Sequence, residues 1–195
     1  MGVSITAEEY KARTAKSYKL MLMVAMVSMT MMFAGLTSAY VVSQSRVDWL
    51  KEFQLPSAFY LSTVAILGCS VAFHLAKKAI QKDEHKKTTI LLLATLVLAI
   101  LFVVLQFVGF SQIVEQGYYF TGSASTITTT FLYIVVLVHL LHLAGGVISL
   151  LVIIYNHFKQ KYNSTQTLGI ELGAMYWHFL DFLWVYLFLF LYFFK

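Results

Sequence analysis

Five long apolar stretches separated by short polar segments dominate the chain, at about residues 20–42, 57–77, 90–113, 128–155 and 172–194. Each is long enough to cross a hydrocarbon core of about 30 Å as an α-helix, which takes roughly 20 residues. None contains an internal proline, and none shows the short alternating segments of a membrane β-barrel. The pattern therefore predicts an all-α membrane protein, a bundle of five transmembrane helices.

The polar residues 1–19 precede the first apolar stretch. Thr6 and Glu9 have the spacing of a helix-capping box, in which each side chain bonds the other's backbone N–H. We therefore expect a short interfacial helix over residues 6–18 in a cytoplasmic tail. Residues 20–195 then form a single five-helix transmembrane domain.

Composition supports a membrane location. Hydrophobic residues make up 59% of the 195 residues and charged residues only 12%, whereas about a quarter of a typical soluble domain is charged. A soluble globular domain and a disordered chain are both excluded. The single cysteine, Cys69, excludes an internal disulfide and a multi-thiolate metal site.

The basic residues are distributed unevenly between the two sides of the membrane. Of the 14 Lys and Arg residues, 11 fall in the N-terminal tail and the second and fourth loops, and three fall on the opposite side. The positive-inside rule then predicts a cytoplasmic N-terminus and a periplasmic C-terminus. The net charge of +5 describes loops beside anionic lipid, so no nucleic-acid partner is expected.

Few ionisable residues lie within the spans, and such residues are functional candidates because burying them in lipid is costly. His139 and His142 lie in the fourth stretch, and Glu171, His178 and Asp181 lie in or at the start of the fifth. Three interpretations stay open from spacing alone. The histidines could ligate haem, a His and Asp path could carry protons or ions, or these groups could satisfy one another and fix helix packing.

The polar residues also suggest structural roles. No Lys or Arg lies inside the spans, so a histidine is the expected partner of Asp181. His142 is favoured over His178, because a bond between the fourth and fifth helices would anchor them. Glu171 and Trp177 are expected near the cytoplasmic interface, where they would help to seat a phospholipid headgroup. No catalytic motif is present, so no catalytic residue is predicted.

The fifth stretch, IELGAMYWHFLDFLWVYLF over 170–188, resembles the signature of subunit III of the haem–copper respiratory oxidases. Glu171 is followed by a Trp-His-Phe-x-Asp-x-x-Trp core that begins at Trp177 and ends at Trp184. The fourth stretch, VHLLHLAGG, is similar to the family's His-Gly-Leu-His-x-x-x-Gly run. The first and second, MMFAGLTSAYVV and LPSAFYLSTVAILGCSVAFHLAKKA, also resemble family segments.

The resemblance implies a non-catalytic subunit of a cytochrome c oxidase in the bacterial inner membrane, in the short five-span form. It implies that subunits I and II are partners and carry haem and copper, while this chain carries neither. It also implies bound phospholipid, stabilisation of subunit I and support of proton uptake. It is compatible with assembly of the oxidase into a larger respiratory supercomplex. A quinol oxidase subunit III is the alternative, followed by an independent proton-coupled transporter.

Two positions depart from the family pattern. Leu140 stands where a glycine is usual between the two histidines. Met29 stands where relatives often carry a reactive glutamate in the first of these five helices. A proton-relay role for that carboxylate is therefore not expected in this chain.

Overall fold

The computed structural model describes residues 6–47, 49–50, 54–122 and 125–194. It contains α1 (Ala7–Val42), a short 3₁₀ helix (Ser43–Ser45), α2 (Ser57–Gln81), α3 (His85–Glu115), α4 (Ile127–Phe158) and α5 (Leu168–Phe193). All five α-helices are long and apolar enough to cross a membrane. The predicted all-α architecture with five membrane-spanning helices is confirmed.

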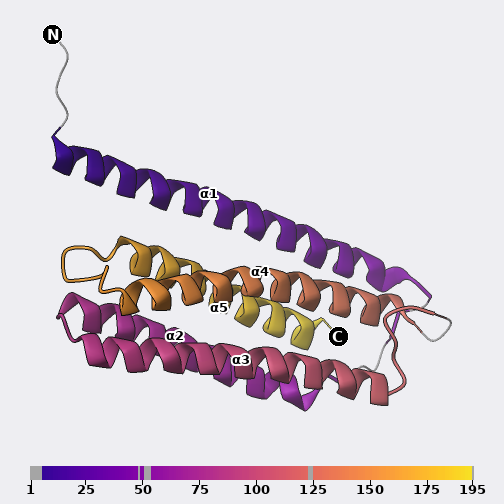
Figure 1. Ribbon diagram of the computed structural model, residues 1–195. Helices are drawn as coiled ribbons and strands as arrows, with labels where there is room; N and C mark the ends of the chain where they lie inside the picture. The colour runs from indigo at the N-terminus through magenta and orange to yellow at the C-terminus, as the bar shows by residue number, and fades with distance from the viewer. Residues whose placement is uncertain (1–5, 48, 51–53, 123–124, 195) are drawn as a thin grey trace, which may run out of the picture.

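The helices run along a common direction, with α1 on the outside (Figure 1). α2 packs along α3 and against α5, α4 packs against α3 and α5, and α1 contacts α4 and α5. Helices α2 to α5 therefore form a four-helix bundle, and α1 lies across the α4–α5 side. The N-terminal end of α1 stands away from the bundle in this view, whereas its C-terminal end approaches it.

Helix α1 begins at the expected capping box. The Thr6 hydroxyl accepts a hydrogen bond from the Glu9 backbone N–H at 3.2 Å, and the Glu9 carboxylate accepts one from the Thr6 N–H at 3.1 Å. From there the helix continues without a break to Val42. The helix expected over residues 6–18 is therefore the first part of α1 and not a separate element.

Aromatic side chains from α1 and α5 hold the C-terminal half of α1 on the bundle. Phe33 is fully buried against α4 and α5. The Thr37 and Tyr186 hydroxyls share a hydrogen bond of 3.0 Å, and the Tyr40 and Phe190 rings meet edge to face with centroids 5.4 Å apart. These contacts fix this end of α1.

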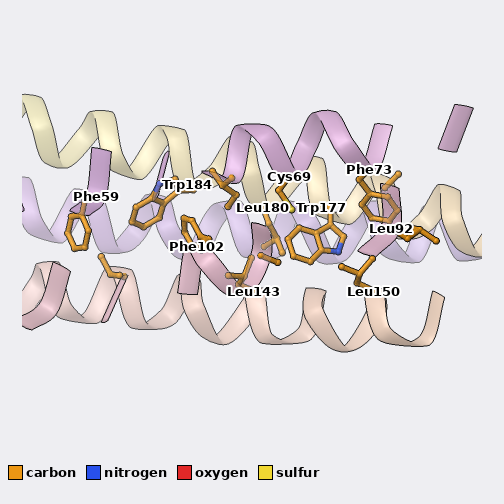
Figure 2. Close-up of a cluster of buried hydrophobic side chains, with 14 of the residues drawn as sticks. Phe59, Cys69, Phe73, Leu92, Phe102, Leu143, Leu150, Trp177, Leu180 and Trp184 are labelled. Atoms are coloured by element: carbon orange, nitrogen blue, oxygen red, sulfur yellow. The ribbon is translucent and has the colours of Figure 1, made fainter. Parts of the chain in front are cut away.

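The core lies between α2, α3, α4 and α5 and is rich in aromatic residues (Figure 2). Trp184 meets Phe59 and Phe102 edge to face, with centroids 5.9 and 5.1 Å apart. Such pairs add about 0.5–1.5 kcal/mol each to the burial of their surface. Because lipid offers no hydrophobic drive for helices to associate, this close packing carries much of the bundle's stability.

Glycines set how closely the helices approach, as Gly109 and Gly146 illustrate. A side chain at Gly109 on α3 would collide with the Phe59 ring of α2. A Cβ at Gly146 on α4 would lie 3.0 Å from Leu180 Cδ1 of α5, which is closer than side-chain carbons normally pack. Small residues at these points let the large rings of neighbouring helices fill the space.

Candidate functional site

The ionisable residues of α5 lie in two different environments. Glu171, in the first turn, accepts hydrogen bonds from Lys19 Nζ of α1 at 2.6 Å and from the Thr167 hydroxyl at 2.7 Å. The side chains of Lys19 and Glu171 are 44% and 24% exposed. Glu171 is thus part of an ion pair that joins the N-terminal half of α1 to the start of α5.

Farther along α5, His178 faces α2. His178 Nδ1 and the Ser70 hydroxyl share a hydrogen bond of 2.7 Å, and the ring of His74 lies 6.0 Å from that of His178. Two turns before Ser70 on α2, the Thr63 hydroxyl accepts a hydrogen bond from Trp184 Nε1 at 3.0 Å. Polar side chains therefore connect α2 and α5 over several turns.

The structure does not pair Asp181 with the histidine that the sequence predicts. Asp181 is 4% exposed and lies near the Ser70 hydroxyl of α2, but neither carboxylate oxygen makes a hydrogen bond of standard geometry to the described residues. His142 Nδ1 instead donates to the Val138 carbonyl of its own helix at 2.7 Å, and His178 bonds Ser70. Asp181 therefore does not tie α4 to α5 through a histidine.

The two histidines of α4 differ in burial. His139 is fully buried, with neither ring nitrogen hydrogen-bonded within the described ranges, and its ring centroid lies 5.2 Å from that of Trp184 and 6.0 Å from that of Phe102. His142 is partly exposed and packs against Phe33 of α1 at 5.8 Å. His142 and His178 thus lie at different helix interfaces, so haem ligation by that pair is not supported.

Trp177 lies inside the bundle rather than at its surface. Its side chain is 1% exposed and packs edge to face on Phe73 of α2, with ring centroids 6.4 Å apart. Figure 2 shows it among Leu143, Leu150 and Leu180. The expectation that Trp177 helps to seat a lipid headgroup is therefore wrong, because no part of the indole is available to a headgroup.

A cleft separates α1 from α4 and α5 near the Lys19–Glu171 ion pair. Its volume is about 930 Å³, and side chains of all three helices and of the α4–α5 loop line it. Most of the wall is apolar and includes Met29. The lining residues with polar groups are Tyr18, Ser149, Asn156, Tyr162 and Tyr176.

Sequence reasoning missed Lys19, Ser70 and the cleft-lining tyrosines. Lys19 is the last member of the basic N-terminal run, which is a signal for a membrane boundary but not for a particular ion pair. Ser70 is a small hydroxyl residue of a kind common in membrane helices. Within the described part of the chain, no group of three or more His, Cys, Asp or Glu residues is arranged to hold a metal ion.

Comparison with known proteins matches residues 6–195 to the sequence model of a family described as cytochrome c oxidase subunit III. Individual relatives carry the name cytochrome c oxidase subunit 3. The protein of Spodoptera frugiperda is 29% identical over 144 residues, which cover 72% of this chain and 89% of that protein.

The protein of Drosophila yakuba is 31% identical over 140 residues, covering 72% of this chain and 50% of the relative. A protein of Bacillus sp. (strain PS3) is 26% identical over 163 residues, covering 82% of this chain and 77% of the relative. The chain spans about half the length of several of the relatives it matches, as in Drosophila yakuba.

Proposed function

The chain belongs to the cytochrome c oxidase subunit III family, and on that premise we propose that it is a non-catalytic subunit of a respiratory oxidase that reduces oxygen to water. The match over residues 6–195, which includes all five membrane-spanning helices, carries this proposal. In this proposal the haem and copper belong to partner subunits I and II, and this chain stabilises subunit I.

The proposed location is the inner membrane of a bacterium, with the N-terminus in the cytoplasm. The uneven distribution of Lys and Arg supports the orientation. The similarity to the Bacillus protein, which covers 82% of this chain, supports the bacterial location. Five helices of 25 to 36 residues fit a multi-pass protein of such a membrane.

We further propose that the cleft between α1 and the α4–α5 side binds a phospholipid. Its volume of about 930 Å³ suits a large amphipathic molecule, and its walls are mainly apolar. Tyr18, Asn156 and Tyr162 provide hydrogen-bonding groups near the ion pair, where a headgroup would lie. Acyl chains would run along the apolar wall toward Met29.

Support of proton uptake is proposed to act through subunit I and not through a carboxylate in α1. Met29 lines the cleft at the position of the family's glutamate, so α1 has no acidic group there to transfer a proton. A bound lipid and a stable helix interface could instead keep the neighbouring subunit in an active conformation.

Purification of the tagged chain from its native membrane tests this function. We expect haem-bearing and copper-bearing subunits to co-purify in fixed stoichiometry, with cytochrome c oxidase activity. Oxidation of quinol but not of cytochrome c would favour the alternative, a quinol oxidase subunit III. A chain that purifies alone and moves protons in vesicles would instead be an independent transporter, and the proposal would fail.

A further inference from the structure

The α2–α5 side of the bundle carries polar groups at its surface. Ser70 and His178 are only partly buried, and His74 is exposed. Thr63, also partly exposed, lies two turns before Ser70 on the same face of α2. We define these four residues, Thr63, Ser70, His74 and His178, as the α2–α5 polar face.

His178 lies well inside the membrane-spanning part of α5. The helix begins at Leu168, so His178 is about 15 Å along its axis at 1.5 Å per residue. The 26 residues of α5 make a helix about 39 Å long, which exceeds a hydrocarbon core of about 30 Å by a few ångströms at each end. A partly exposed imidazole at this depth would meet acyl chains if lipid covered it.

Acyl chains cannot satisfy that imidazole. His178 Nδ1 is bonded to the Ser70 hydroxyl, and Nε2 has no hydrogen bond to the described residues. An unpaired polar group in hydrocarbon is costly, so polar residues in membrane helices usually face protein or water. The outer surface of α3 is different, because its exposed residues there, such as Val97, Ile100 and Val104, are apolar and suit lipid.

The polar face also has a definite electrostatic character. The rings of His74 and His178 lie 6.0 Å apart, and Lys77 follows His74 by three residues on α2. Of the carboxylates close by, Glu171 is bonded to Lys19, and Asp181 is buried. The face therefore presents two imidazole rings and two hydroxyl groups, which suits a hydrogen-bonding partner that bears a carboxylate or a hydroxyl.

We propose that the α2–α5 polar face packs against a membrane helix of a neighbouring oxidase subunit that presents a carboxylate or hydroxyl to His178 Nε2. This inference rests on the proposed function as an oxidase subunit. The Tyr60 and Phe188 rings, 5.1 Å apart edge to face, extend the same side of the bundle beyond Thr63 and offer aromatic surface to that helix.

Photo-cross-linking within the intact oxidase tests the location. A photoreactive residue would replace Leu67 on α2 or Phe182 on α5, both exposed beside the polar face. Matched controls would replace Val97 and Val104 on α3. We expect cross-links to a haem-bearing subunit from Leu67 and Phe182, and to lipid from the α3 positions. Lipid adducts at Leu67 and Phe182 with protein adducts from α3 would overturn the inference and leave the subunit assignment intact.

Two substitutions test the role of the imidazole. Ser70→Ala removes the internal hydrogen bond but keeps the ring, whereas His178→Leu removes both the internal bond and the proposed external one. Both variants are compared by the dissociation constant of this chain from the oxidase in detergent. We expect this constant to be about three times larger for His178→Leu than for Ser70→Ala, which is the effect of one interhelical hydrogen bond. Equal effects of the two variants would contradict the proposal. A chain that never co-purifies with haem would refute the proposed function as well.

Discussion

Lys19 Nζ of α1 lies 2.6 Å from Glu171 Oε2 of α5, and this ion pair bridges two helices that diverge on either side of a cleft. The Thr167 hydroxyl orients the same carboxylate from the α4–α5 loop side. At its other end, α1 is held by Phe33, Thr37 and Tyr40. The Lys19–Glu171 pair is therefore a polar contact that ties the N-terminal half of α1 to α5.

Loss of that pair should loosen the N-terminal half of α1. Spin labels at Ser17→Cys and Thr165→Cys report the distance between the two segments by pulsed electron paramagnetic resonance. In Lys19→Met we expect a longer mean distance and a broader distribution. The change in stability should stay below about 1 kcal/mol, because the pair is partly exposed. Lys16→Met, one turn earlier on the exposed surface, is the control and should change nothing. An unchanged distribution in Lys19→Met would show that other contacts hold the helix.

Filling the cleft should displace bound lipid. Ser149 lines the cleft, so Ser149→Phe should lower the phospholipid that co-purifies with the oxidase by about one molecule per chain. Ile148→Phe adds the same ring on an exposed position of α4 outside the cleft and is the matched control. Native mass spectrometry or phosphate analysis measures the difference. Equal lipid content in the two variants would contradict a lipid site in this cleft.

Replacing Asp181 with leucine should not weaken the bundle. No hydrogen bond of standard geometry to the described residues is lost, and a buried carboxyl group is replaced by an apolar group of the same branched shape. We expect the unfolding free energy in detergent to be unchanged or to rise by about 1 kcal/mol. Asp181→Asn is the isosteric control. A loss of more than about 1 kcal/mol in the leucine variant would reveal a partner such as a buried water.

Enlarging Gly146 should separate α4 from α5. A Cβ there would lie 3.0 Å from Leu180 Cδ1 and 3.5 Å from the Trp177 ring. We expect Gly146→Val to destabilise the bundle by about 1–3 kcal/mol, the cost of overpacking a well-packed core. Gly145→Val changes the same residue type at the exposed neighbouring position and should cost less. Thermal unfolding in detergent compares the two, and equal midpoints would argue against close α4–α5 packing.

The orientation can be tested by labelling. Thr121 lies in the charge-free α3–α4 loop, and Lys82 follows the last turn of α2 on the opposite side. In intact spheroplasts a membrane-impermeant maleimide should label Thr121→Cys but not Lys82→Cys. Cys69 is buried and should give little background. The reverse labelling pattern would invert the proposed topology.

The helices were predictable because length and apolarity alone define a membrane span. The capping box of Thr6 and Glu9 also marked the start of α1. The sequence did not predict that one helix runs on past residue 19. The basic residues there indicate a membrane boundary, and such a boundary does not show whether the helix continues across it.

The partners of the buried polar groups were harder to predict. Helical spacing tells which residues share a face, but not how each helix is rotated toward its neighbours. Asp181 and His142 therefore looked like partners although His142 bonds its own helix. Trp177 was expected at the interface from the general preference of tryptophan, yet the room left by Gly146 lets it enter the core.

The way α1 is attached makes it a lever. Thr37, bonded to Tyr186, and Lys19 are 18 residues apart, about 27 Å along the helix axis. A tilt of about 5° at Thr37 would move Lys19 by about 2 Å, enough to break its contact with Glu171. Bilayer thickness and lateral pressure, which act on helix tilt, would thereby be converted into opening or closing of the cleft. A small mechanical change in the membrane could thus alter access to a site inside the protein.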